Sequence, residues 1–308
     1  MKRFLKIIGV LVALILVLAV VGFIYMDSIA TATVEKATAF ATECDVEIDK
    51  VDVRPLKGQA IITGMYIKNP DMQGDNPEGF REVHENFLHL ETGGGEVSLG
   101  TLRSDEVVVP EVAIDGVTIS LIGRDGKTNY QTLLASLKRL QGEEEQEDPS
   151  AEETGGKTFT ISVVTIDNVR VWVDMDEDPV LGLAPVQFDE PLTIKPIKLT
   201  DVGQGGVPLS QISADLIADI LIQVVAQLGD QLGDRILSGL TSGLAGIVGE
   251  GELQEMLPDI DVSKQIAKAE ELYDATAEAI GDITEGAGDL IDDIGGNIGG
   301  FLGGNDED

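Results

Sequence analysis

The sequence predicts an α+β protein. We expect an N-terminal transmembrane helix, then a curled antiparallel β-sheet that forms a groove, with short covering helices and a helical, glycine-rich, acidic C-terminal tail. Three observations support this prediction. Residues 4–25 are almost wholly apolar; about nine segments of alternating apolar and polar residues follow, with hardly any helical segment between them. After Pro208 the apolar residues recur at the helical spacing.

The first element is a membrane anchor at residues 1–27. About 20 apolar residues in a helix span the hydrocarbon core of a bilayer, which is roughly 30 Å thick. The predicted membrane-anchor residues are Phe4, Leu11, Leu14, Leu18, Phe23 and Tyr25. Basic residues precede the apolar run, which predicts a single-pass protein of the inner (cytoplasmic) membrane with its bulk in the periplasm. A cleaved signal peptide is the alternative, although its apolar region is usually only about 7–15 residues long.

The net charge excludes one class of partner. The chain has 55 acidic and 21 basic residues, which gives a formal net charge of −34. Phosphate backbones are bound by lysine and arginine in excess, so we expect no nucleic acid partner. The single cysteine, Cys44, rules out an internal disulfide.

Residues 28–141 form the first β segment with its helices. A helix is expected over residues 28–43. Strands follow, with an interruption of the alternation at Lys50 that predicts a β-bulge. The Gly93-Gly94-Gly95 run is interpreted as a turn between strands, and Asp115-Gly116 as a hairpin turn. A helix with one apolar stripe is expected over residues 130–140.

The remaining segments change composition sharply. We expect an acidic linker at 142–157, a second β segment at 158–207, an amphipathic helical region at 208–249 and an acidic, partly disordered tail at 250–308. In the helical region, Gly239 and Gly243 lie four residues apart, a spacing that lets helices approach closely.

Catalytic chemistry is hardly visible in the sequence. There is no nucleophile motif, phosphate-binding loop or zinc-ligand pattern, and the two histidines are His84 and His89. Asp174 and Asp176 lack the glycine and distal glutamate of a calcium loop, so a solvated loop is predicted. We therefore expect a non-enzymatic protein without a metal or cofactor.

The apolar face of the predicted sheet is the candidate site. Such a face must be covered, because burying each Val, Leu or Ile contributes roughly 1.5–3 kcal/mol. The possible covers are the chain's own helices, a partner protein or acyl chains. The predicted lining residues are Val46, Ile48, Val51, Val53, Ile62, Val112, Ile114, Ile119, Ile161 and Val171.

The order of these pieces resembles the AsmA-like family of bacterial envelope proteins. The matching residues are Gly58, Gly64, Asn69-Pro70, Gly79-Phe80, Ser98-Leu99, Val109-Pro110-Glu111-Val112 and Asn129-Tyr130 with Leu133-Leu134. The resemblance covers about residues 1–225 and carries no catalytic signature. It implies a curled sheet whose apolar lining holds lipid tails, and a link to phospholipid movement and envelope integrity.

Two functions follow as expectations. The first is a membrane-anchored periplasmic protein that binds or shuttles lipid through an apolar β-groove and supports envelope and outer-membrane maintenance, with envelope proteins as further partners. The chain is far shorter than the family's bridge-forming members, so a local role at the inner membrane fits better. The alternative is a structural or adaptor protein whose sheet is covered by its own helices or by a partner. The strand ending at Asn69-Pro70, which is also similar to the sandwich domains of LEA-14-type proteins, favours this second class.

Overall fold

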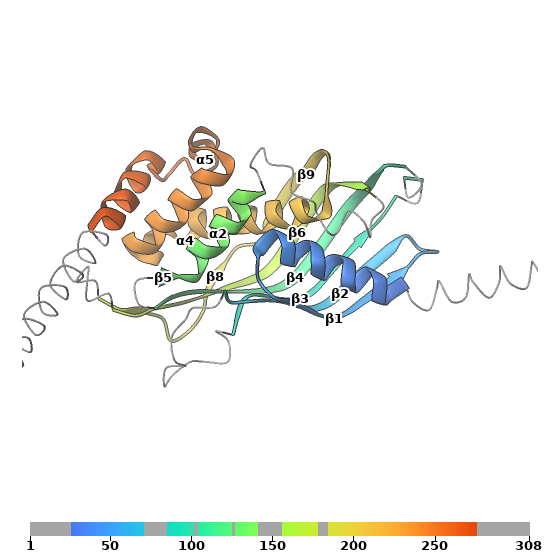
Figure 1. Ribbon diagram of the computed structural model, residues 1–308, viewed down its shortest axis with the longest axis horizontal. Helices are drawn as coiled ribbons and strands as arrows, with labels where there is room; N and C mark the ends of the chain where they lie inside the picture. Colours follow the sequence, from blue (N-terminus) through green and yellow to red (C-terminus); the bar gives the residue numbers. More distant parts are fainter. Residues whose placement is uncertain are drawn as a thin grey trace, which may run out of the picture.

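The protein is an α+β molecule with one mixed, unclosed sheet and its helices gathered over one side of that sheet (Figure 1). The computed structural model describes residues 26–70, 85–98, 100–101, 104–124, 127–140, 156–177 and 184–275. The predicted anchor residues, most of the acidic linker, His84 and the tail from residue 276 lie outside this described part.

The sheet contains nine strands, and its main path runs β1-β2-β3-β4-β6. The long strands are β1 (Val46–Arg54), β2 (Gln59–Lys68), β3 (Asn86–Glu96), β4 (Glu106–Arg124), β6 (Thr158–Met175) and β9 (Ile197–Val207). The short strands are β5 (Lys127–Thr128), which pairs with β4, and β7 (Val186–Gln187) and β8 (Leu192–Ile194), which pair with β6. β9 also pairs with β6, antiparallel.

One pairing contradicts the prediction of a wholly antiparallel sheet. β4 and β6 run parallel, and they pair from Glu106 with Thr158 to Gly123 with Met175. Parallel neighbours need a crossover connection that returns the chain to the starting end of the sheet. The helix α2 (Asn129–Arg139) lies within that connection. The helix was predicted, but its role as a crossover was not.

The alternation of inward and outward residues is interrupted at one level across five strands. The inward residues on either side of the interruption are Ile48 and Val51, Ile62 and Met65, Leu90 and Gly93, Ile114 and Val117, and Ile166 and Val169. In each pair the two inward residues are three positions apart, and the strands keep their register through the interruption. We call this level the kink row. The expected bulge at Lys50 is therefore one part of a kink that all five strands share.

Glycines make the kink row possible on the outer face. Gly64 and Gly116 have φ of 58° and 76°, and Asn168 has φ of 56°. A Cβ on Gly64 would collide with the side chain of Asp49, and a Cβ on Gly116 with that of Glu91. Asp115-Gly116 is thus not a hairpin turn, because β4 continues through it. The positive φ lets the strand change direction without ending.

The helices form the second layer. A helix over residues 26–42 is hydrogen-bonded to β1 through Asp27 and Glu35. α4 (Leu209–Val248) packs on β6, β8 and β9, with α2 beside it (Figure 1). α4 bends at Gly233, whose φ of 73° is not helical. α5 (Glu250–Met256) and a helix over residues 262–275 follow it.

The glycines of α4 mark its contact with α2. A Cβ added to Gly239 would meet Tyr130, one on Gly243 would meet Leu134, and one on Gly246 would meet Lys138. The two helices therefore lie side by side in the same direction, with bare backbone of α4 under the side chains of α2. The close approach expected from Gly239 and Gly243 is confirmed.

α4 is also the one helix in the described part that is long and apolar enough to cross a membrane. It is central in the chain and is not the predicted N-terminal segment. Its most apolar window is 56% buried inside the protein. Length and composition of this kind suit a core helix equally well, and α4 lies in the core here.

Candidate functional site

The ten predicted lining residues share one face of the sheet. Residues that lie opposite one another on successive strands form rows across the sheet. Val46, Ile119 and Val171 belong to one row, and Val51, Ile62 and Ile114 belong to a second. Val53 and Val112 belong to a third. Ile48 lies between the first two of these rows. Ile161 pairs with Val109 beyond the last row, where the alternation is interrupted again, because Val109 and Val112 are three positions apart and both approach the inner side of Gly95. This is the face that the helices cover, and we call it the inner face.

Helices close much of the inner face. Ile119 and Val171 are 0% exposed and belong to a core that also contains Leu232, Leu240 and Leu244 of α4. Over this part of the sheet the chain itself provides the cover. The sequence left open whether the 212–247 helix closes the sheet, and the structure places it there.

The edges of the sheet are blocked by helix side chains. The backbone N–H of Val53 donates to Asp27 at 2.9 Å, and that of Ile48 donates to Glu35 at 2.9 Å, so the helix over residues 26–42 caps the free edge of β1. On the other side the N–H of Lys195 donates to Gln227 of α4. A partner strand that added to β1 would have to displace these bonds, so β1 is a poor template for strand addition.

The cover is thinnest at the end of the inner face beside residues 26–30. Here a group of inward apolar residues is only half-buried, and we call it the half-buried strip: Val53, Ala60, Ile62, Val109, Val112 and Phe159. Val53, Ala60 and Ile62 are also absent from the main hydrophobic core and from the residues packed against it. This strip is a group of inward apolar residues at one end of the sheet that the helices leave partly exposed.

The glycine run of β3 crosses the strip. Gly93, Gly94 and Gly95 lie inside the strand and pair with both neighbours, so the prediction of a turn was wrong. Gly93 and Gly95 face inward, where a Cβ would approach Ile114 at 3.5 Å and Val112 at 3.1 Å. Glycine inside a strand weakens it, so it commonly marks a place where another group approaches closely. The strip therefore has two successive positions without a side chain at its middle.

Ala60, Val109, Phe159, Gly93 and Gly95 were missed by sequence reasoning. The signal for the glycines was present, since apolar alternation leads into residue 90 and resumes at residue 97. The interpretation of the three glycines as a turn concealed the fact that one strand runs through them.

A cavity lined by none of the strip residues lies in the helical layer. It has a volume of about 600 Å³ and lies between α2, α4 and the helix over residues 262–275. Its lining includes Lys127, Gln131, Ser136, Arg235 and Tyr273. None of the ten predicted residues lines it, and its lining also includes the apolar Ala135, Ala269 and Leu272. The nearby Tyr130 hydroxyl has no hydrogen-bond partner within the described residues, and burial raises its pKa to about 12.

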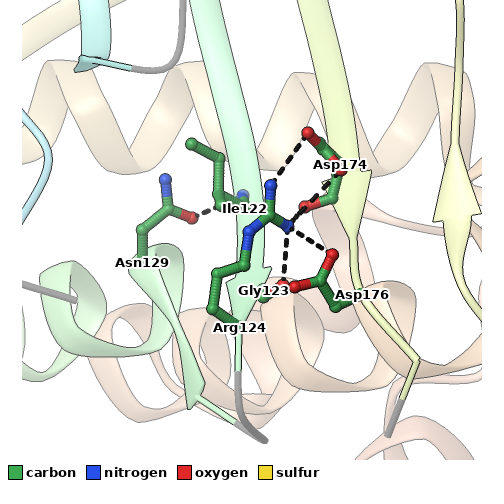
Figure 2. A network of polar contacts seen from close by, with 6 residues as sticks. All are labelled: Ile122, Gly123, Arg124, Asn129, Asp174 and Asp176. Carbon is green, nitrogen blue, oxygen red and sulfur yellow. Dashed lines mark hydrogen bonds and ion pairs between the residues drawn. The ribbon is translucent and has the colours of Figure 1, made fainter. Parts of the chain in front are cut away.

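The most connected polar cluster is structural. Figure 2 shows Arg124 at the end of β4, with its guanidinium 2.9 Å from Asp174 Oδ2 and 3.2 Å from Asp176 Oδ1. The Asp174 side chain is only 8% exposed, so the expected solvated loop is wrong for this residue. Asn129 accepts from the Ile122 N–H in the same region, which fixes the start of α2 to β4. This cluster locks the ends of the parallel pair.

Among the described residues there is no group of three or more His, Cys, Asp or Glu side chains that could hold a metal ion. His89 lies on the outer face, where its ring stacks on Tyr66 at 4.5 Å. Comparisons with protein-family models, with curated proteins and with solved structures found no match.

Proposed function

We propose that the protein is a membrane-anchored periplasmic protein that binds lipid acyl chains at the half-buried strip and thereby supports maintenance of the cell envelope. The likeness to AsmA-like proteins belongs to the same proposal. The single observation that carries it is the half-buried strip itself, an inward apolar surface, half of it outside the main core, that runs across two side-chain-free positions of β3.

The location of the strip supports loading from a bilayer. Val53 is held to Asp27, and Asp27 is the last residue of the predicted anchor. A lipid tail that moves from the bilayer to the half-buried strip remains partly in contact with water, so the hydrophobic free energy of transfer does not favour the strip strongly. Such a balance suits reversible loading and release more than tight storage.

A structural or adaptor role is the second candidate. It is favoured by the extent to which the chain covers its own sheet, since Leu232, Leu240 and Leu244 of α4 are 0% exposed. In that case the strip would be covered by an envelope protein and would hold no lipid.

The test compares two glycine variants on opposite faces of β3. Gly93→Val places a branched side chain on the inner face, where a Cβ makes ordinary contacts at 3.5 Å and beyond. Gly94→Val places the same side chain on the outer face, where a Cβ meets Ala60 O at 3.4 Å. Each full-length variant is placed in vesicles that contain a phospholipid with a photoreactive group at the tail end. Cross-linked peptides are then mapped by mass spectrometry.

Cross-links to residues 1–25 report the anchor and serve as an internal reference. The lipid proposal predicts further cross-links to the strip in the wild type and in Gly94→Val, and a several-fold loss in Gly93→Val. Cross-links confined to the anchor in all three proteins would contradict the lipid proposal and favour the adaptor role. Thermal unfolding shows whether both variants remain folded.

A further inference from the structure

Two exposed apolar side chains lie at the same end of the molecule. Leu56 is 88% exposed at the turn between β1 and β2, and Ile29 is 57% exposed near the start of the helix over residues 26–42. These are the two most exposed of the large aliphatic side chains in the described part. The other exposed large apolar residues, Met256 and Tyr273, lie in α5 and in the helix after it.

A hydrogen bond places the segments that carry these two side chains at the same end of the sheet. Asp27 accepts from the Val53 N–H at 2.9 Å, and the turn that carries Leu56 begins two residues after Val53. Three residues span at most about 10 Å, so Leu56 cannot lie far from the level of Asp27. The turn is itself closed, because Lys57 N donates to Arg54 O at 2.9 Å and Val97 N donates to Gly58 O. Leu56 therefore lies on a turn that backbone hydrogen bonds hold in place.

The chain continues directly from this end into its most apolar segment. The helix over residues 26–42 follows residues 4–25, which are long enough to span a bilayer. Figure 1 shows the β1–β2 turn and the start of that helix at the same end of the long axis, with α5 toward the other end. If residues 4–25 span a bilayer as predicted, the surface of that bilayer is close to Ile29 and to the end of the molecule that carries Leu56. Exposed Lys57 beside Leu56 suits a headgroup region, where a cation can stay in contact with water and phosphate.

We propose that the turn at residues 55–58 and the start of the helix over residues 26–42 form a membrane-docking tip, with Leu56 and Ile29 inserted into the bilayer surface. The partner is the lipid surface that holds the anchor. Docking at this tip stands the sheet end-on to the bilayer, so that the half-buried strip lies at the end of the sheet nearest the bilayer. The inference rests on the predicted anchor, which is part of the proposed function, and does not depend on acyl-chain binding.

Depth-dependent fluorescence quenching tests the tip. The full-length chain carries Trp172→Phe, which removes the one native tryptophan, and either Leu56→Trp or Met256→Trp. Met256 is the matched control, because it is 41% exposed and lies in α5. Each protein is reconstituted into phosphatidylcholine vesicles with and without bromine on the acyl chains. A side chain lying about 5–10 Å into the interface contacts the brominated region.

If the tip docks as proposed, the fluorescence of Leu56→Trp falls roughly two-fold in brominated vesicles relative to vesicles without bromine, while that of Met256→Trp is unchanged. Equal, unquenched signals would overturn it, and quenching at both positions would show that the molecule lies flat. Ile29→Trp repeats the test if Leu56→Trp fails to fold. Quenching at residue 56 without cross-links to the strip would leave the tip intact and refute acyl-chain binding alone.

Discussion

Gly243 of α4 offers a quantitative test of how the helices close the inner face. A Cβ on this glycine would lie 2.5 Å from Leu134 Cδ1 and 3.1 Å from Leu134 Cβ. Both distances are shorter than an ordinary carbon contact of about 3.5–4.0 Å. Gly243→Ala must therefore push α2 away from α4 or force Leu134 into a strained rotamer, and overpacking of this kind costs typically about 1–3 kcal/mol.

Helix propensity acts in the opposite direction. Alanine is more favourable than glycine in a helix interior by about 1 kcal/mol. The net expectation for Gly243→Ala is a loss of about 0–2 kcal/mol in the free energy of unfolding. Gly251→Ala in α5 is the matched control, because nothing lies within 4 Å of its added Cβ. That variant should gain up to about 1 kcal/mol.

Chemical unfolding of the two full-length variants under one set of conditions gives the difference directly. We expect Gly251→Ala to be the more stable by about 1–3 kcal/mol. Adding Leu134→Ala should make Gly243→Ala less damaging than it is alone, since residues in contact do not act additively. If Gly243→Ala were as stable as Gly251→Ala, or more stable, the close packing of α2 on α4 would be refuted.

Three further predictions concern charged groups. Arg124→Met leaves the Asp174 carboxylate buried without its main partner, and unfolding experiments should show a loss of about 3–5 kcal/mol. Burial beside other carboxylates raises the pKa of Asp219 from 3.8 to about 6, so the folded chain holds this proton more tightly and stability is lost as the pH rises from 4 through 6. Asp219→Asn should thus raise stability at pH 7, by at most about 3 kcal/mol, and flatten its pH dependence. Glu35→Ala should speed amide exchange at Ile48, with a stability loss of about 1 kcal/mol, and unchanged exchange would contradict the edge cap.

The inner face was predictable because strand periodicity is local. All ten lining residues chosen from alternation lie on one side of the sheet, including those on either side of the kink row. The interruption at Lys50 was visible as well. What one strand could not reveal is that its neighbours kink at the same level, because that depends on pairing between distant segments.

The wrong predictions concern residues and segments that can serve more than one structural role. Glycine serves turns, and it also serves strands where a neighbour approaches closely, so Gly93 and Gly116 were assigned to turns. The parallel pairing of β4 with β6 was hidden because α2 was not recognised as part of a crossover. Asp174 was expected in a solvated loop because its partner Arg124 lies 50 residues away in the sequence.

The most direct test of lipid contact at the half-buried strip uses a photoreactive benzoylphenylalanine at one of two aromatic positions. Phe159 faces inward in the strip, while Tyr66 lies on the outer face against His89. The full-length chain is irradiated in its native membrane, and adducts are identified by mass spectrometry. Lipid adducts at position 159 and none at position 66 are the predicted result. Absence of lipid from position 159, or equal labelling of both positions, would contradict the lipid-binding account.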